Sequence, residues 1–512
     1  MGVLSRVDPG GPLGYRGWWM TGASDSEARE FAAAFRSFIQ WVHTTDPMRS
    51  EVTDLVAGFL GEGVSDRSVV SRSLRPFEHV NLQTALDAWA REPSREVEVQ
   101  GISVPPHHGG ASLQQIIAAE GIGHLRLSAP ALVDLPNGPG STLACLQLAL
   151  LLVSDDLGRY VVMVSGPMEQ HDPTINVEIA GLPVEAAQAV HARLDDFRSR
   201  LNVYRGHVLD VALTPGGGVA LTFGDLPVTA REDVVLPEEV LVRVERHALA
   251  VADHREALLE AGQHLKRGLL LFGPPGTGKT HTMRYLVGRM DTYTRLILSG
   301  RALHAIGSAS ELARDLEPAV LVLEDVDLVA GDRSFGPGAT PVLFELLNAM
   351  DGAAADADLL FVLTTNRADL LEPALAARPG RVDVAVEIDL PDADARRRLF
   401  ALYARGVPLQ LSDNDIDEII ARTDGVTASF LKELLRRSVL AALDEGAADT
   451  AVTAKHTTEA LEDLLHTNQQ LTRSLLGVGN DPASLPAGGG VGSLPPQRGH
   501  LRGRFIGGDA GR

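Results

Sequence analysis

Short apolar runs alternate with helical segments between about residues 268 and 388. Several of these runs, such as Ala319-Val320-Leu321-Val322-Leu323, are apolar throughout. Strands covered on both faces have this continuous apolar pattern. The predicted strands are 269–272, about 294–298, 319–323, 359–363 and 382–388. The alternation predicts a doubly wound α/β domain with a parallel sheet.

The pattern changes after residue 391. Apolar residues then recur at helical spacing, and the predicted helices are about 392–404, 413–422, 427–444 and 453–475. Ser412 and Thr427 stand where two of the helices would begin, and both residue types are good N-caps. This part of the chain is expected to form a small helical domain.

The first half of the chain is more mixed. Helical spacing dominates residues 24–95, whereas residues 96–235 combine short strands with a helix at about 184–201. The last strands of this half are predicted at 208–213 and 219–223. The mixture predicts an α+β domain of its own, and it contains no catalytic motif.

The strand at 269–272 leads into Gly273-Pro274-Pro275-Gly276-Thr277-Gly278-Lys279-Thr280, and a helical segment follows. This fits the phosphate-binding pattern G-x-x-x-x-G-K-[ST] in its strand–loop–helix setting. Glycines let backbone N–H groups surround phosphate oxygens, and a helix N-terminus adds partial positive charge. The chain has only four lysines, yet Lys279 stands where the motif needs an ammonium. The sequence therefore predicts bound ATP with Mg²⁺, Lys279 reaching the β and γ phosphates and Thr280 ligating the metal.

Polar residues follow two of the later strands. Glu324-Asp325-Val326-Asp327 comes directly after 319–323, and Asn366 follows 359–363. A buried strand that delivers carboxylates is how a P-loop enzyme holds Mg²⁺ and orients water. We expect Glu324 and Asp325 to join Thr280 at the metal, Asp325 to orient the attacking water and Asn366 to position it. The residues expected to hold the nucleotide are Gly273, Pro274, Pro275, Gly276, Thr277, Gly278, Lys279, Thr280 and His281.

Arg378 and Arg381 have no local acidic partner in the segment Arg378-Pro379-Gly380-Arg381. Arginines near a nucleotide site are suited to stabilising phosphate charge during transfer. Surface arginines without such a role are the alternative that this segment alone leaves open.

Composition narrows the classes of partner. The net charge of −21 argues against broad binding to nucleic acid, although Arg498, Arg502 and Arg504 leave a nucleic-acid-binding tail open. Cys145 is the single cysteine, so an internal disulfide is excluded. No apolar run is long enough to span a membrane, and the first residues do not resemble a signal peptide. A cytoplasmic location is expected.

Together these motifs resemble the AAA family of ATPases, over about residues 236–465. The matching stretches are the phosphate loop, Glu324-Asp325-Val326-Asp327, Leu346-Leu347-Asn348-Ala349-Met350-Asp351-Gly352, Thr364-Thr365-Asn366-Arg367, Pro373-Ala374-Leu375 and Arg378-Pro379-Gly380-Arg381-Val382-Asp383. The resemblance implies that Asn366 is the sensor asparagine and that Arg378 and Arg381 reach into a neighbouring subunit's site. It implies a helical lid whose sensor-2 turn is Gly425-Val426-Thr427-Ala428. It also implies a ring, usually a hexamer, that uses ATP hydrolysis to remodel or move macromolecules.

The sequence departs from the family pattern in three places. Glu324 precedes Asp325 where Asp then Glu is usual, an order most similar to the branch containing the mitochondrial Rieske-protein translocase; the shorter base would slow turnover. Ala305-Ile306-Gly307, preceded by His304, stands where the pore loop usually carries an aromatic residue, which argues against processive threading. The zinc motif H-E-x-x-H is absent, which argues against the membrane-protease branch.

The expected organisation follows from these observations. The parts are a disordered segment 1–23, an amino-terminal substrate or adaptor domain 24–235, an α/β nucleotide-binding domain 236–390, a helical lid 391–476 and a flexible Gly/Pro/Arg tail 477–512. The leading hypothesis is an ATP-hydrolysing ring that remodels a protein held through residues 24–235. The alternatives are a nucleotide-gated scaffold with slow hydrolysis and, with less support, a nucleic-acid remodeller.

Overall fold

The computed structural model describes residues 30–35, 37, 50–61, 63, 68–104, 111–118, 125–167, 174–214, 218–327, 341–352, 357–367, 382–445 and 451–465. The expected disordered segment 1–23, the expected tail 477–512 and the two candidate arginines Arg378 and Arg381 lie outside these residues. The chain divides into two compact units. One contains residues 1–226, 255–267 and 290–361, and the other contains residues 227–254, 268–289 and 362–512.

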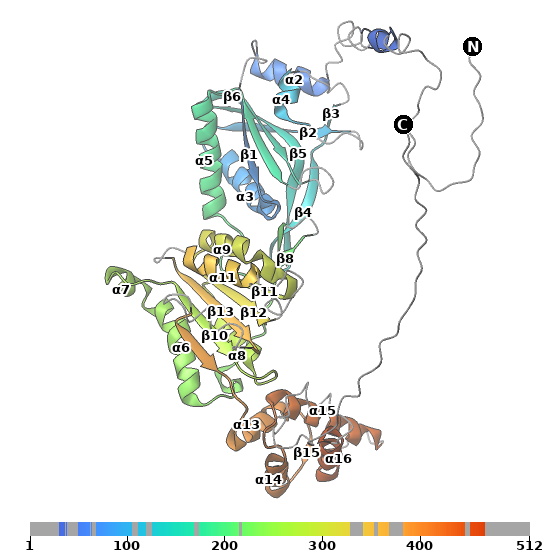
Figure 1. The fold of residues 1–512 in the computed structure, drawn as a ribbon. Coiled ribbons are helices and arrows are strands. Elements are labelled where there is room, and N and C mark those ends of the chain that lie inside the picture. The colour runs from blue at the N-terminus through green and yellow to red at the C-terminus, as the bar shows by residue number, and fades with distance from the viewer. Residues whose placement is uncertain are drawn as a thin grey trace, which may run out of the picture. The chain divides into compact units, whose positions relative to one another are not determined.

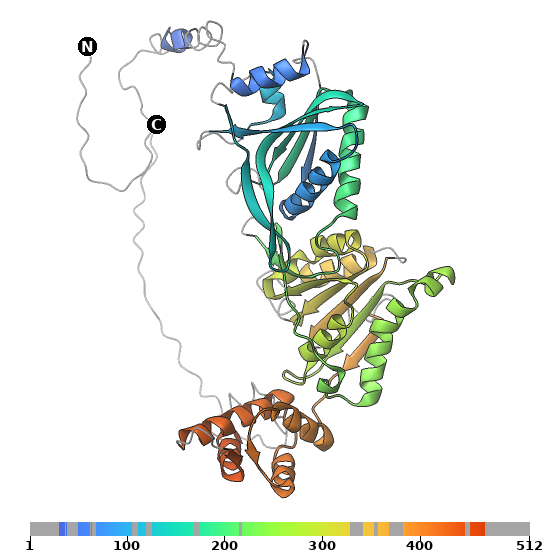
Figure 2. The same ribbon diagram turned by 180° about the vertical axis from the view of Figure 1, so that it is seen from behind.

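The first sheet is antiparallel and lies in the amino-terminal half of the chain (Figure 1). Its strand order is β1-β7-β6-β5-β2-β3, and β4 pairs with β5. Figure 2 shows the same ribbon from behind. The strands are β1 (Val69–Leu74), β2 (Glu96–Ser103), β3 (Arg126–Ser128), β4 (Ala131–Gly138), β5 (Ser141–Asp155), β6 (Gly158–Ser165) and β7 (Ile175–Ala180). The helices of this part are α2 (Glu51–Leu60), η2 (Pro76–Glu78), α3 (His79–Ala90), α4 (Leu113–Ala118) and α5 (Val184–Arg200).

Both faces of this sheet are covered by helices. Successive side chains of a strand point to opposite faces, and β6 shows the consequence. Val162 and Val164 belong to the core formed with α3 and α5, whereas Val161 and Met163 belong to the core formed with α2 and α4. The central residues of β6 are therefore apolar on both faces, although β6 pairs with antiparallel strands on both sides.

The second sheet has the order β14-β10-β13-β12-β11-β8-β9. The pairs β14–β10, β12–β11 and β11–β8 are parallel, and β8–β9 is antiparallel. The strands are β8 (Val208–Leu213), β9 (Val219–Phe223), β10 (Arg267–Phe272), β11 (Thr294–Ser299), β12 (Ala319–Glu324), β13 (Leu359–Thr365) and β14 (Val384–Glu387). The helices are η3 (Arg231–Asp233), α6 (Glu238–Asp253), α7 (Arg255–Glu260), α8 (Lys279–Gly288), η4 (Gly300–Ala305), α9 (Ile306–Asp315) and α11 (Pro341–Gly352). The predicted α/β fold with a P-loop sheet is confirmed.

One expectation about this sheet is wrong. The strands at 208–213 and 219–223 exist, but they do not complete the amino-terminal α+β sheet. Val208, Leu209 and Ile297 lie in the β8–β11 pairing, so β8 and β9 extend the second sheet. Arg205 strengthens the junction, because its guanidinium donates to the carbonyl oxygens of Asp315 (2.7 Å) and Glu317 (2.8 Å). Sequence periodicity predicts a strand but does not choose its partner.

The last part of the described chain is helical. Its helices are α13 (Ala393–Tyr403), α14 (Asp413–Arg422), α15 (Ala428–Asp444) and α16 (Ala454–Leu465), with a short parallel pair β15 (Leu409–Gln410) and β16 (Val452–Thr453). Phe430, Leu431 and Leu434 of α15 lie in its core. The predicted N-caps are confirmed: Ser412 accepts from the Asp415 amide and Thr427 from the Phe430 amide.

Candidate functional site

The phosphate loop joins the buried strand β10 to helix α8. Three of its glycines have positive φ: 141° at Gly273, 78° at Gly276 and 109° at Gly278. Gly278 is also the N-cap of α8, and it has no side chain that could satisfy the amides of the first turn. Such a helix start offers its N–H groups to an anion. The loop therefore fits the phosphate chain of a nucleotide.

Close backbone approach explains why two of these positions are glycine. A Cβ added at Gly273 would lie 2.2 Å from the carbonyl oxygen of Ile388. A Cβ at Gly276 would lie 2.8 Å from Oγ of Ser429. Any larger residue would displace the loop from the strand end or from the helical part.

Lys279 lies across the loop. Its side chain is only 5% exposed, and its Nζ donates to the carbonyl oxygens of Gly273 (2.9 Å) and Pro274 (2.8 Å). Thr277 braces the same turn, because its Oγ1 donates to the Pro274 carbonyl at 3.0 Å. A phosphate is a stronger, charged acceptor for an ammonium than a carbonyl oxygen. The lysine is therefore held at the place where the motif requires it.

The next two residues differ in exposure. Thr280 is half-buried on the first turn of α8, next to Lys279. His281 is exposed, and its Nε2 lies 3.2 Å from the carbonyl oxygen of Asp233, to which it donates.

The helical part touches the loop through a residue that sequence reasoning missed. Ser429 donates from its amide to the carbonyl oxygen of Gly276 at 3.2 Å, and its Oγ lies 3.4 Å from the same oxygen. Ser429 directly follows the expected turn Gly425-Val426-Thr427-Ala428, in which Gly425 has φ 73°. Only the tertiary contact identifies the serine, because its spacing matches no motif.

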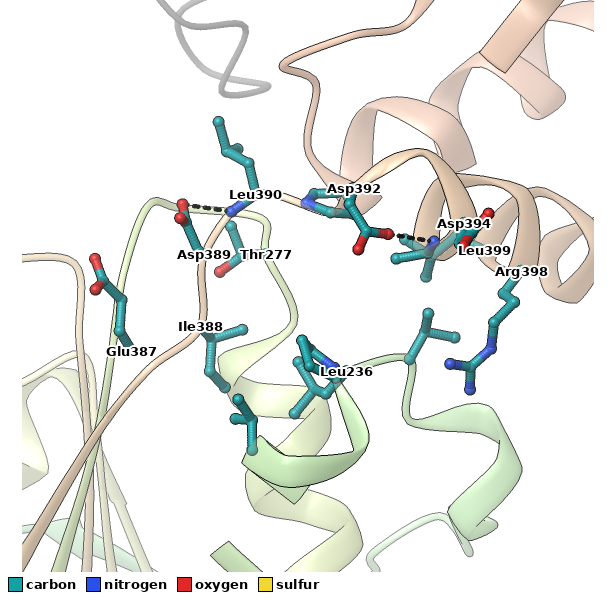
Figure 3. Close-up of a pocket in the computed structure, with 15 residues that line it drawn as sticks. Leu236, Thr277, Glu387, Ile388, Asp389, Leu390, Asp392, Asp394, Arg398 and Leu399 are labelled. Carbon is teal, nitrogen blue, oxygen red and sulfur yellow. Dashed lines mark hydrogen bonds between the residues drawn. The ribbon is translucent and has the colours of Figure 1, made fainter. Parts of the chain in front are cut away.

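A cavity of about 330 Å³ opens beside Thr277 (Figure 3). Its lining joins four segments: the phosphate loop, the residues after η3, the end of β14 with the turn that follows, and the start of α13. The lining residues are Val235, Leu236, Pro237, Val240, Thr277, Glu387, Ile388, Asp389, Leu390, Pro391, Asp392, Asp394, Ala395, Arg398 and Leu399. Mostly apolar walls with a few polar groups are typical of ligand pockets. Sequence reasoning missed this wall, since Val235, Leu236 and Pro237 form no motif.

The acidic residues lie at the end of β12, in the other compact unit. Ala319 to Leu323 are fully buried, whereas Glu324 and Asp325 are half-buried. Asp325 has φ 51°, a left-handed conformation that is uncommon for a residue with a side chain. Outliers of this kind cluster at functional sites. The strand thus stops being apolar where the carboxylates begin.

Asn366 directly follows β13, the neighbour of β12 in the sheet order. Thr364 and Thr365 are fully buried, and Asn366 is half-buried. The Arg367 amide donates to Oγ1 of Thr365 at 3.0 Å, which turns the chain after the strand. Arg378 and Arg381 lie outside the described residues.

The position expected for the pore loop is buried. Ala305 is 5% and Ile306 is 1% exposed at the junction of η4 and α9, while His304 is exposed. No aromatic side chain stands between His304 and Gly307.

In the part of the chain that the structure describes, no group of three His, Cys, Asp or Glu residues is placed so that it could hold a metal ion. Magnesium at a nucleotide takes one or two protein oxygens together with phosphates and waters. The Thr280 hydroxyl and the carboxylates after β12 are suitable oxygen donors of this kind. None of the described helices combines the length and apolarity that crossing a membrane would need.

Comparison with known proteins agrees with this geometry. Residues 269–390 match the model of the ATPase family associated with various cellular activities (AAA). The human ATPase family gene 2 protein homolog A is 27% identical over 394 residues, which cover 74% of this chain and 41% of that protein. The ATP-dependent zinc metalloprotease FtsH 3 of Symbiobacterium thermophilum is 33% identical over 202 residues, 37% of this chain and 32% of that protein.

An archaeal relative matches to a similar extent. The Cell division cycle protein 48 homolog of Archaeoglobus fulgidus is 28% identical over 236 residues, 44% of this chain and 32% of that protein. The chain thus spans about two fifths of the first relative and about a third of the other two.

Proposed function

We propose that the chain acts as a ring-forming remodelling ATPase on a protein substrate. Its residues 269–390 match the AAA family of ATPases, whose members hydrolyse ATP with Mg²⁺ at a phosphate loop. The observation that carries this proposal is the phosphate loop itself. Its glycines, its uncapped helix start and the buried Lys279 form a cradle for phosphate, and Ser429 connects that cradle to the helical lid.

The nucleotide is assigned to two adjoining places. The triphosphate lies on the loop, with Lys279 neutralising charge on the β and γ phosphates. The nucleoside occupies the cavity beside Thr277, whose apolar walls Leu236, Ile388 and Leu399 suit a flat base. This assignment is supported because the cavity and the loop share Thr277 and lie in one compact unit.

Hydrolysis needs groups that hold the metal and direct water. Mg²⁺, when bound, would neutralise phosphate charge, and Thr280, Glu324 and Asp325 are the residues proposed to hold it. Asp325 would orient the water for in-line attack, and Asn366 would keep it in place. Asp325 is one carbon shorter than glutamate, so turnover would be slow.

Arg378 and Arg381 are proposed to act between subunits, at the site of a neighbouring protomer. That role requires a ring, and a hexamer is the expected size. Residues 24–235, all of which precede the family match, would hold the protein substrate, and the protein would work in the cytoplasm. The net charge of −21 argues against nucleic acid as the main partner.

A nucleotide-gated scaffold is the second candidate. The buried Ala305 and Ile306 at the pore-loop position favour it, because they offer no exposed aromatic grip for a threaded chain. In this case ATP binding would assemble the ring, and slow hydrolysis would reset it.

ATPase turnover measured against protein concentration separates the two. For a ring motor, specific activity rises cooperatively with concentration and falls about 1,000-fold or more in Arg378→Ala, the scale typical of arginine fingers. For a scaffold, turnover stays near background while ATP still assembles the oligomer. Lys279→Ala is the control, since it should abolish nucleotide binding; unchanged ATP affinity in that variant would refute the site.

A further inference from the structure

The short segment η3 contacts two elements that enclose the proposed nucleotide site. The carbonyl oxygen of Asp233 accepts a hydrogen bond from Nε2 of His281, on the first turn of α8, at 3.2 Å. The carboxylate of Asp233 accepts from Nη1 of Arg405 at 2.5 Å. Arg405 comes two residues after α13, the first helix of the lid. A single residue therefore joins the phosphate-loop helix, through its main chain, to the lid, through its side chain.

The residues after Asp233 fix its position. Val234 is only 2% exposed, and Val235 packs against the core of the lid. Leu236 and Pro237 then line the cavity beside the phosphate loop. These apolar contacts fix the backbone of the segment. The carboxylate of Asp233 therefore has a defined position from which it bonds to Arg405.

The other side of the segment is tied to α6 and α8. Arg231 donates to Glu245 (2.9 Å) and to Glu238 (2.7 Å), both on α6. Glu245 also accepts from the Tyr285 hydroxyl of α8 at 2.5 Å. The segment is thus bound to the phosphate-loop helix independently of Asp233, and the Asp233 carboxylate is the part of it that makes an ion pair with the lid.

From this geometry we propose that Asp233 is a positioning residue for ATP turnover. Its carboxylate holds the lid through Arg405, and its carbonyl oxygen holds the phosphate-loop helix through His281. Asp233 thereby fixes the position of the lid relative to that helix. The inference rests on the proposed function, because the lid matters only if a nucleotide lies beneath it. It assigns a role to a residue that precedes the phosphate loop by forty positions and belongs to none of the motifs.

The exposure of the pair sets the size of the effect. The Arg405 side chain is 61% exposed and that of Asp233 is 25% exposed. Ion pairs this accessible to water and salt change an equilibrium by about two- to five-fold, not by orders of magnitude. The pair should therefore tune nucleotide affinity and leave the fold intact.

The test compares full-length wild type with Asp233→Asn, Arg405→Gln and the double variant. Each single variant should raise the Kd of a fluorescent ADP and the KM for ATP about two- to five-fold, with a smaller change in kcat. The double variant should be no worse than either single one, because both remove the same pair. The difference from wild type should vanish at about 0.5 M salt, where the pair is screened.

Lys455→Gln is the matched control. It breaks an exposed ion pair with Glu445, and neither of these two residues lines the cavity beside the phosphate loop. It should leave the ADP affinity unchanged. Additive losses in the double variant, a salt-independent loss, or wild-type affinity in both single variants would each overturn the proposal.

Hydrogen exchange without nucleotide gives a second, independent readout. The lid amides of Ala404 and Arg405, bonded to the carbonyls of Phe400 and Leu402, should exchange faster in Asp233→Asn, because they lie where the carboxylate holds the lid. Unchanged exchange there would show that the carboxylate does not hold the lid. If the wild-type protein does not bind ATP, the proposed function is wrong. If the wild type hydrolyses ATP and the Asp233 variants keep the wild-type nucleotide affinity, only this inference is wrong.

Discussion

The two large sheets of this chain use polar residues in opposite ways. In the amino-terminal sheet, titratable side chains lie inside and bond to a neighbouring element. His79 Nε2 lies 2.7 Å from the Leu146 carbonyl, and the Glu178 carboxylate accepts from the Leu113 amide at 2.9 Å. In the second sheet, β12 and β13 are apolar along their length, and polar residues gather where the strands end.

This difference separates residues that stabilise the fold from residues proposed to act in ATP hydrolysis. Cys145 is fully buried, and burial raises the pKa of its thiol to about 11, which is the environment of a packing residue. Burial likewise raises the pKa of the Glu178 carboxyl, because the residue is only 8% exposed. Changes in the first sheet should therefore alter stability, and changes at the strand ends of the second should alter turnover.

The largest expected effect is on the first sheet. Trp89 is fully buried, its ring lies 6.4 Å from that of Tyr160, and the Arg95 guanidinium lies 4.2 Å above it. Trp89→Ala should lower the free energy of unfolding by about 3–5 kcal/mol, because truncation leaves a cavity. Urea unfolding measures the loss, with Leu201→Ala (42% exposed) as control. A similar loss in both variants would mean that the core does not carry the stability.

The second expected effect is on chemistry alone. Asp325→Asn should keep ATP binding while turnover falls about 100-fold or more, the scale of a lost general base. Asparagine tolerates the left-handed conformation at φ 51°, so the backbone should persist. Steady-state ATPase and ADP binding measure the two properties. Asp327→Asn is the control and should retain turnover. Normal turnover in Asp325→Asn would contradict the proposal that Asp325 orients the attacking water.

The smallest expected effect is on pH dependence. Burial lowers the pKa of His79 and of His191 below the ordinary value near 6.5. The unfolded chain then binds more protons, so their stabilisation is fully present above pH 6.5 and is lost as the pH falls below it. The slope is at most about 1.4 kcal/mol per pH unit for each histidine. Urea unfolding between pH 7.5 and 5.5 measures it, and His79→Gln, which can still donate to Leu146, should reduce the slope.

Much of the nucleotide site follows from local sequence. The phosphate loop, the strands before it and the acidic residues after β12 are encoded by spacing within a few residues, and the same holds for the N-caps Ser412 and Thr427. Local spacing determines local conformation, so these predictions needed no knowledge of distant contacts.

The parts that could not be predicted depend on contacts between distant residues. Ser429 reaches Gly276 and Arg405 reaches Asp233 only because the lid is folded against the loop, and no spacing encodes that. The sheet predicted for β8 was wrong for the same reason, because the apolar pattern of β8 would fit the exposed edge of either sheet. Physical chemistry allows several docking solutions for one strand, and the tertiary fold selects among them.

The β8–β9 extension also has a mechanical meaning. A force pulling the amino-terminal half away along the strands would load the backbone hydrogen bonds between β8 and β11 side by side, in shear. Further hydrogen bonds would share that load: those from Arg205 to the carbonyl oxygens of Asp315 and Glu317, and that from the Arg295 amide to the His207 carbonyl oxygen. If the amino-terminal half holds a substrate, as proposed, tension on that substrate would reach β11 through these hydrogen bonds.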